Sequence, residues 1–341
     1  MNDLNLFDRM KAAPRGGGFA MEGYWVWCGS VVQGEDGRYH MFASRWPKTL
    51  PMHPGWLVQS EVVRAVSDTP EGPYVFQEIV LPARGAEYWD GRCTHNPHIV
   101  KFQDQYLLYY MGTTHPFADI NSDENLTLSR PEVVVARSNK RIGLATASSV
   151  TGPWRRLNAP ILSVRPGKFD SYLTSNPAPC VNEDGSVLLI YKSRRYEGHR
   201  YSHMYLGAAW AERPEGPYRP MSDEPIFDPS EVHLEDPFIW RTADGYRMIA
   251  KDMDGRIGDE RHGGIAALST DGLHWSIASE AKAYSRRILW DDGRMTTMGN
   301  FERPFLLFRD GRPTHLFAAT ADGEGEFSGS NTWNMVIPLQ I

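Results

Sequence analysis

The sequence predicts an all-β protein folded as a five-bladed β-propeller, and three observations carry this prediction. First, one phrase returns five times: an apolar run that usually contains proline, then an aspartate, then a run of aromatic and aliphatic residues. Second, the aspartates recur at intervals of 68, 80, 60 and 66 residues, which suits a blade with inserted loops. Third, a Gly-Pro-aromatic turn follows in three repeats, at 72–74, 152–154 and 216–218. The five aspartates are Asp36, Asp104, Asp184, Asp244 and Asp310.

Each repeat is interpreted as four antiparallel strands. The proline-led run, such as residues 95–100, is the first strand and lines the propeller axis. The aspartate makes a tight turn into a second strand, such as residues 106–110. A third strand ends in small residues, as at 142–147, and the Gly-Pro-aromatic turn leads to the outer strand. We therefore predict one domain over residues 1–341, with blades at about 22–86, 92–164, 172–228, 234–290 and 298–341.

The last repeat shows only three strands, the third at residues 332–339. We expect the N-terminal segment to supply the fourth and close the ring, because closure removes exposed sheet edges. An alternative is that residues 1–11 form a short helix that packs on a neighbouring subunit, which would fit a homo-oligomer.

Composition excludes several classes of protein. The net charge is −6 with both signs interspersed, whereas nucleic-acid binding needs clustered positive charge. No apolar run is long enough to predict a membrane span, and residues 1–18 do not resemble a secretory signal. The three cysteines, Cys28, Cys93 and Cys180, have no CxxC spacing and fit a reducing compartment. We expect a cytoplasmic protein with no nucleic-acid or membrane partner.

The repeat register places functional candidates on one face of the propeller. The leading residues of each first strand should meet there with the loops at 43–60, 113–141, 192–203 and 251–264. These loops are rich in arginine and lysine, whose charged groups bind carboxylate, sulfate or phosphate. This pattern suggests an acidic saccharide as substrate; the alternative is that the cations pair with acids on the same loops.

With its blades in this order, the chain resembles the five-bladed propeller glycoside hydrolases of family 43, the arabinofuranosidases and xylosidases, with neoagarobiose hydrolases more distant. The resemblance implies that Glu235, in Glu235-Asp236-Pro237, is the general acid, whose burial should raise its pKa. The positions of the family's other two catalytic aspartates hold Cys28 and Asn176. Neither replaces an ionised carboxylate, so the usual inverting mechanism does not carry over.

Another residue must therefore supply the second catalytic group. Glu302 holds the place in the fifth repeat that Glu235 holds in the fourth, and the two could lie at the roughly 6.5–9.5 Å typical of inverting enzymes. Asp236 is a lesser candidate, and His95 could act as acid or base or simply contact the sugar. The residues expected to bind substrate are Glu22, Arg45, Trp46, Asp90, Asn96, Asn176, Arg194, Arg195, His199, Lys251 and Arg303.

These observations predict a glycoside hydrolase that degrades a short, uronate-containing oligosaccharide. Three alternatives stay open: a phosphorylase, a uronate lyase or dehydratase, and a sugar-binding propeller without catalysis. No organic cofactor is predicted. Members of the resembling group sometimes hold a cation on the axis, but no spacing in this sequence forms a recognised metal site, so the metal stays undetermined.

Overall fold

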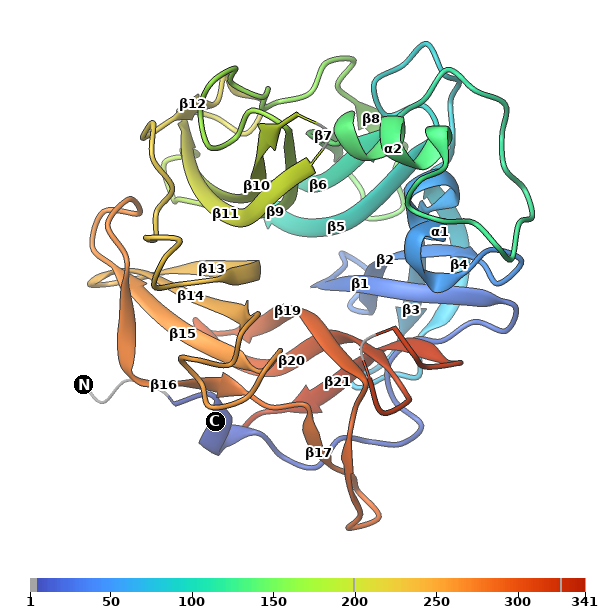
Figure 1. The fold of residues 1–341 in the computed structure, drawn as a ribbon. Helices are drawn as coiled ribbons and strands as arrows, with labels where there is room; N and C mark the ends of the chain where they lie inside the picture. The colour runs from blue at the N-terminus through green and yellow to red at the C-terminus, as the bar shows by residue number, and fades with distance from the viewer. Residues whose placement is uncertain (1–4, 199, 326, 341) are drawn as a thin grey trace.

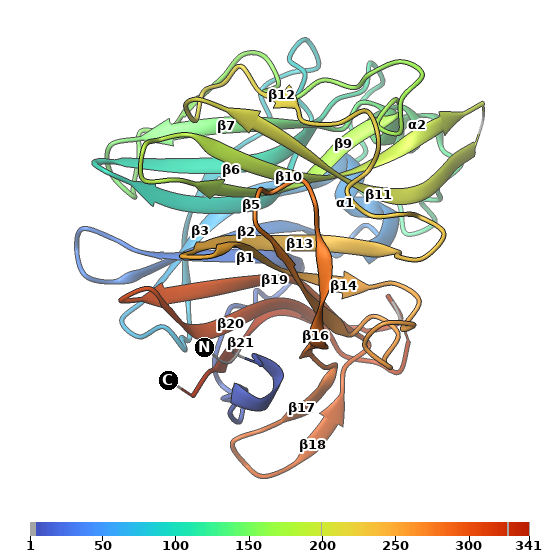
Figure 2. The same ribbon diagram turned by 90° about the vertical axis from the view of Figure 1, so that its left-hand side faces the viewer.

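The computed structural model describes residues 5–198, 200–325 and 327–340, and it confirms the predicted fold class. Five antiparallel sheets stand around a central axis (Figures 1 and 2). Blade one is β1 (Tyr24–Gln33), β2 (Tyr39–Pro47), β3 (Glu61–Ser67) and β4 (Val75–Leu81). Blade two is β5 (Cys93–Phe102), β6 (Gln105–Thr113), β7 (Arg141–Ala147) and β8 (Arg155–Arg156). Blade three is β9 (Leu173–Val181), β10 (Val187–Glu197), β11 (Arg200–Ala211) and β12 (Arg219–Pro220).

Blade four is β13 (Leu234–Thr242), β14 (Gly245–Asp252), β15 (Gly264–Ser269) and β16 (Ser276–Tyr284). Blade five has three strands, β19 (Asn300–Arg309), β20 (Arg312–Ala321) and β21 (Thr332–Pro338). A separate hairpin, β17 (Arg287–Leu289) and β18 (Met295–Thr297), joins blades four and five. The short helices are η1 (Phe7–Arg9), α1 (Met52–Gln59) and α2 (Pro131–Ser138). Among the described residues, no helix is long and apolar enough to cross a membrane.

The innermost strand of every blade bulges at the same place in the repeated phrase. The pairing register between the first and second strands of each blade shifts at this place. The first strands are β1, β5, β9, β13 and β19. At each bulge a residue other than glycine has a positive φ, between 50° and 57°: Cys28, Asn96, Asn176, Asp236 and Arg303. Such backbone is uncommon and concentrates at functional sites. Each copy of the repeated phrase therefore contains one bulge residue with a positive φ, and the five bulges lie around the axis.

The N-terminal segment lies at the outer edge of blade five, the place expected for a ring-closing segment. Met10 bridges Leu339, and Phe19 bridges Asn334 of β21. These are isolated antiparallel bridges, and the segment forms no regular fourth strand. Near the start of the chain η1 is a single 3-10 turn, so the alternative of a helix over residues 1–11 is not found in residues 5–11; residues 1–4 lie outside the described part.

We expect Phe19→Ala to lower the free energy of unfolding by about 3–5 kcal/mol, because it empties a buried aromatic site in the closing segment. Phe19 is 1% exposed and belongs to the largest apolar core. Urea unfolding measures the effect. The matched control is Val75→Ala on the outer strand β4, where the side chain is 62% exposed and truncation should cost less than about 1 kcal/mol. Equal losses in the two variants would contradict a closing role for the segment.

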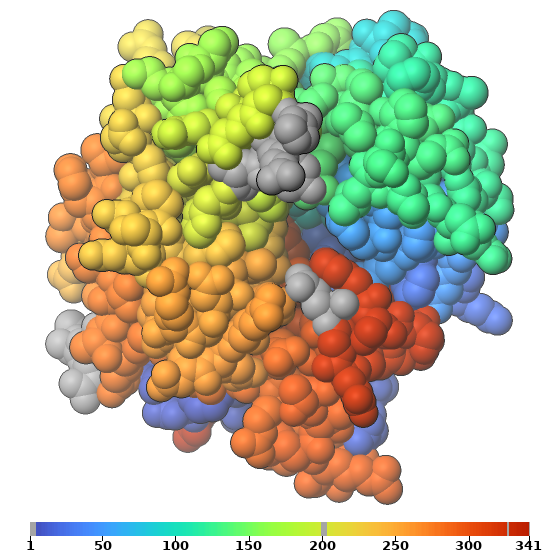
Figure 3. Space-filling model, in the orientation of Figure 1, coloured from blue at the N-terminus to red at the C-terminus, as the bar shows by residue number. Residues whose placement is uncertain are grey.

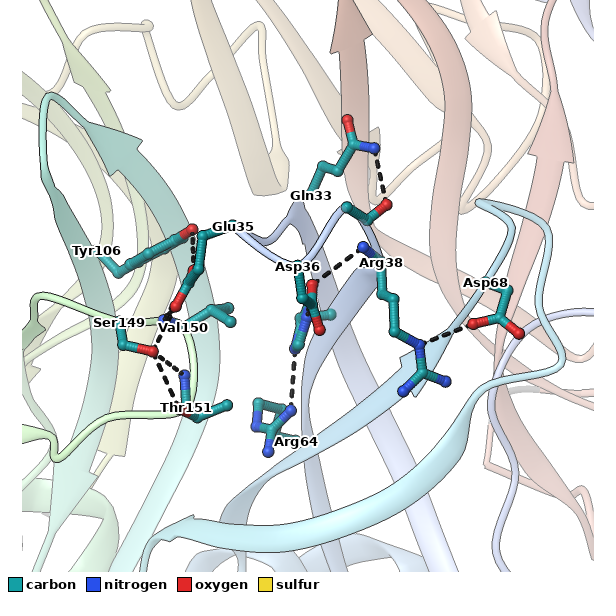
Figure 4. A network of polar contacts seen from close by, with 12 residues as sticks. Gln33, Glu35, Asp36, Arg38, Arg64, Asp68, Tyr106, Ser149, Val150 and Thr151 are labelled. Carbon is teal, nitrogen blue, oxygen red and sulfur yellow. Dashed lines mark hydrogen bonds and ion pairs between the residues drawn. The ribbon is translucent and has the colours of Figure 1, made fainter.

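Polar contacts also fasten blade one to blade two. Figure 4 shows Glu35, in the turn between β1 and β2, accepting a hydrogen bond from Tyr106 Oη at 2.7 Å. The same carboxylate accepts bonds from the Ser149 hydroxyl and from the backbone N–H of Val150 at 3.2 Å. This turn lies at the far end of β1 from Trp27 and Cys28, so it ties two blades together without contacting the axial bulges.

Candidate active site

A pocket of about 230 Å³ opens where the five axial bulges meet the loops that carry α1 and α2. Figure 3 shows the hollow near the middle of this face, between the loops of several blades. It is smaller than the roughly 300–1,000 Å³ typical of sites for drug-sized ligands, so it suits a small terminal group. The lining residues are Trp27, Trp46, Met52, His53, Trp56, His95, Asn96, Arg137, Lys140, Asn176, Lys192, Arg194, Met204, Glu235, Asp236, Met253, Glu302, Arg303 and Phe327.

The side chains of the five bulge residues form a chain of hydrogen bonds around the axis. The Cys28 thiol donates to Asn96 Oδ1 at 2.8 Å, and Asn96 Nδ2 donates to Asn176 Oδ1 at 2.8 Å. Asn176 Nδ2 then donates to Asp236 Oδ1 at 2.6 Å, and Arg303 Nη1 reaches the same oxygen at 3.3 Å. Burial raises the pKa of Cys28, so the thiol stays protonated. This chain carries one carboxylate, neutralised by one guanidinium.

Lys251 gathers three carboxylates behind the pocket. Its Nζ lies 2.7 Å from Glu235 Oε2, 3.0 Å from Glu302 Oε2 and 3.5 Å from Asp236 Oδ2. Lys251 stands directly opposite Glu235 in the pairing of β13 with β14, and it is 1% exposed. Burial lowers its pKa, but the three carboxylates outweigh burial and hold it well above the ordinary value. Lys251 was predicted to contact the sugar; in the structure its ammonium group contacts the three carboxylates, and the residue does not line the pocket.

Glu235 is ionised in this arrangement, contrary to the protonated state expected from its burial. Burial does raise its pKa, but Lys192 and Lys251 outweigh that effect and hold the pKa well below the usual value. Lys192 contacts Oε1 and Lys251 contacts Oε2, so each carboxylate oxygen has an ammonium partner. A group held ionised cannot donate the first proton to a leaving oxygen.

Glu302 has the environment that was expected for Glu235. Burial raises its pKa to about 7; Lys251 opposes the rise, and the nearby charges of Asp236 and Glu235 add to it. Asn300 Nδ2 donates to Glu302 Oε1 at 2.5 Å and fixes the side chain. Glu302 Oε2 and Glu235 Oε2 both contact Lys251 Nζ, so these two oxygens are at most 5.7 Å apart, the sum of 2.7 and 3.0 Å. This bound holds for one oxygen of each carboxyl group, and it places the two groups side by side.

His95 faces the pocket as a neutral imidazole. Burial lowers its pKa well below the usual value, and the positive charges of Arg303 and Lys140 lower it further. Nδ1 lies 2.7 Å from Ser60 Oγ, and the ring stacks on Trp56 with centroids 4.7 Å apart. An imidazole held neutral cannot act as the initial proton donor, and the roles of base and of sugar contact both stay predictions.

Two residues expected to bind substrate are instead paired with other side chains away from the pocket. Arg45 pairs with Glu61 at 2.8 Å and lies over the Tyr24 ring. Asp90 is fully buried, 2.6 Å from Arg84 and 3.3 Å from Arg156, and it accepts a hydrogen bond from Tyr110. Each charged group is thus already paired, and neither residue lines the pocket.

The other predicted contacts divide between the pocket and the surrounding surface. Glu22 and Arg195 are exposed and do not line the pocket, and His199 lies outside the described residues. The residues that the structure does bring together there are Trp46, His95, Asn96, Asn176, Arg194, Glu235, Asp236, Glu302 and Arg303.

Sequence reasoning did not single out Lys140, Arg137, His53 and Phe327, which also line the pocket. Lys140 and Arg137 come from the inserted loop at 113–141, which the register did place on the binding face. Only the packing of α2 against α1 decides which of its side chains turn inward. Within the described ranges, no cluster of three or more histidine, cysteine, aspartate or glutamate side chains is arranged to hold a metal ion.

The structure resembles the five-bladed propeller glycoside hydrolases over nearly its whole length. A family 117 glycoside hydrolase produced by the marine bacterium Zobellia galactanivorans has a TM-score of 0.69 at 17% identity, covering 99% of this chain and 92% of the other. A family 43 β-xylosidase/α-arabinofuranosidase from a compost metagenome gives 0.60 at 12%, covering 97% and 95%. The arabinanase of Bacillus subtilis gives 0.55 at 11%, covering 93% and 94%.

No protein-family profile matches the chain, and no curated protein matches it by sequence. At such low identities the likeness to solved structures shows the fold alone. The chemistry has to be derived from the pocket.

Proposed function

We propose that the protein is a glycoside hydrolase that removes one terminal sugar from a short acidic oligosaccharide, with Glu302 as general acid. One observation carries the proposal: two buried carboxyl groups contact the same ammonium group, yet their pKa values are driven in opposite directions. When the pKa values of two neighbouring titratable groups are driven apart in this way, the group with the higher pKa can act as the acid and the other as the base or nucleophile. Glu302, with a pKa of about 7, can hold a proton, and Glu235 supplies the negative charge.

The closeness of the two carboxyls favours a double displacement. Glu302 donates its proton to the leaving glycosidic oxygen while a carboxylate oxygen of Glu235 bonds to the anomeric carbon. Water then attacks that carbon, gives a proton to Glu302, and releases Glu235 as a carboxylate. Enzymes that work this way have carboxyls about 5–5.5 Å apart, and the shared contact with Lys251, which keeps Oε2 of Glu235 within 5.7 Å of Oε2 of Glu302, is compatible with that spacing.

The charge of the pocket supports an acidic substrate. Among the described lining residues, five side chains are cationic and three are carboxylic. The cationic ones are Arg137, Lys140, Lys192, Arg194 and Arg303, and the carboxylic ones are Glu235, Asp236 and Glu302. An excess of positive charge in a narrow cleft raises the local concentration of an anionic ligand. The small volume supports binding of one terminal residue.

A panel of matched neutral and uronate-containing oligosaccharides tests the proposal. We expect release of a single acidic sugar from one end, detected by chromatography, without added phosphate. Release of neutral sugars alone would contradict the acidic substrate. Turnover only in the presence of phosphate would identify a phosphorylase, and an unsaturated product absorbing in the near ultraviolet would identify a lyase.

We further expect the released sugar to keep its anomeric configuration, because a double displacement through Glu235 inverts the anomeric carbon twice. Proton NMR of the first product formed, recorded before mutarotation, measures the configuration. The same reaction run in the presence of methanol should give a methyl glycoside of that configuration. An inverted first product would rule out Glu235 as the nucleophile.

A further inference from the structure

Lys140 is a buried lysine whose side-chain nitrogen has no carboxylate partner among the described residues. It is the residue before β7, it lines the pocket, and it is 3% exposed. Its Nζ lies 5.2 Å from the centroid of the Trp56 ring. In the part of the chain that the structure describes, no hydrogen bond or ion pair to this ammonium group is found. A buried charge without a partner is costly, so its retention in a pocket points to a ligand that supplies the partner.

The surroundings of Lys140 are mainly positive. Burial lowers its pKa well below the ordinary value, and Lys192, Arg137 and Arg194 lower it further. Glu235 opposes this effect, but both of its oxygens already contact other lysines. The charged and titratable groups that face Lys140 are Arg137 on α2, Lys192 and Arg194 on β10, Glu235 on β13, His53 on α1, and His95 and Cys93 on β5.

We propose that Lys140, with Lys192 and Arg194 beside it, forms a subsite for an oxyanion, and that this oxyanion is the carboxylate of the terminal sugar. The inference rests on the proposed function, because it assigns the acidic group of that substrate to named residues. A carboxylate placed against Lys140 provides the missing counter-charge and restores the proton that burial and neighbouring cations tend to remove. The same chemistry would bind inorganic phosphate, so the experiment has to separate the two sources.

Calorimetric titration of the purified protein with paired monosaccharides tests the subsite without requiring catalysis. The pairs are galacturonate with galactose and glucuronate with glucose, which differ only in the carboxylate. We expect one acid to bind at least tenfold more tightly than its neutral partner. Lys140→Met should reduce that ratio to about one and leave the affinity for the neutral sugar unchanged. The matched control is Lys48→Met, an exposed lysine that does not line the pocket, which should preserve the ratio.

Three outcomes separate this inference from the proposed function. If neither uronate binds more tightly than its neutral partner, the carboxylate subsite is overturned, whatever the hydrolase assay shows. A preference that survives Lys140→Met also overturns it. Binding of inorganic phosphate that depends on Lys140, with no binding of either uronate, overturns the sugar carboxylate as the ligand and replaces hydrolysis by phosphorolysis.

Proton uptake gives an independent readout. Titrations in two buffers with different ionisation enthalpies should show a fractional proton taken up when the acid binds, because the ligand raises the pKa of Lys140. This uptake should disappear in Lys140→Met and persist in Glu302→Gln. Uptake lost in Glu302→Gln and retained in Lys140→Met would assign the proton to the carboxyl and overturn the role of Lys140. Thermal unfolding shows whether the methionine variant is folded, and its melting temperature should be at least that of the parent protein.

Discussion

Replacing Lys251 by methionine is expected to lower the free energy of unfolding by about 3–5 kcal/mol at pH 7, the usual cost of removing one partner from a buried ion pair. Glu235, Glu302 and Asp236 all lie within 3.5 Å of this one ammonium group. Methionine nearly matches the length of the lysine stem, so the loss comes mainly from charge. Urea unfolding at fixed pH measures the change.

The pH dependence of this loss identifies its cause. The pKa of Glu302 is raised to about 7 although Lys251 opposes the rise, so without Lys251 it should rise further, and such a group stabilises the folded state less as pH rises. The difference in the free energy of unfolding between the variant and the parent protein should therefore be smallest near pH 5 and grow toward pH 8. The double variant Lys251→Met/Glu302→Gln should recover part of the stability at pH 7, because one buried charge is gone. A loss that is the same at every pH, with no recovery in the double variant, would mean that Lys251 acts through packing.

The fold could be predicted from sequence because its signals are local and repeated. A tight turn at Asp36 or Asp104 and the Gly-Pro-aromatic turns depend on neighbouring residues only, and five copies reinforce one another. The same register identified equivalent axial positions, such as Asn96 and Asn176, and the bulges in the structure fall on these positions. Glu302 followed from that register as the counterpart of Glu235.

The ionisation of these side chains could not be predicted in the same way. Glu235 is ionised because Lys251 pairs with it across the blade and Lys192 reaches it from β10 of the preceding blade. The first contact follows from strand pairing, but the second depends on how two blades pack. Asp90 shows the opposite case: this carboxylate lies just before an axial strand but pairs with Arg84, in the same connecting segment, and with Arg156 on β8. The position of a residue in the repeat determines whether its side chain approaches the axis. The packing of neighbouring blades and loops around that side chain determines whether it is ionised.

Replacing Glu302 by glutamine is expected to lower kcat by about 10²–10⁴-fold, the usual contribution of a positioned general acid. The amide keeps the shape of the side chain but cannot transfer a proton. A substrate with a good leaving group, such as a nitrophenyl glycoside, should be affected much less in its first step, because that leaving oxygen needs no proton. Glu280→Gln, which changes an exposed glutamate on β16, is the control and should keep full activity. Full activity of Glu302→Gln on a natural oligosaccharide would remove Glu302 from the mechanism.

The pH profile separates this acid role from a merely structural one. The pKa of Glu302 is raised to about 7, so the parent enzyme should lose activity as pH rises through 7 and the carboxyl loses its proton. Stability should follow the same sign: the folded-state pKa lies above the unfolded value, so the contribution of Glu302 declines as pH rises from about 4.5 toward 7. In Glu302→Gln both trends should vanish, and the variant should become more stable than the parent above pH 7. A buried carboxyl with only a structural role would show the stability trend without the loss of activity, because stability responds to the burial of the charge and catalysis to the proton it carries.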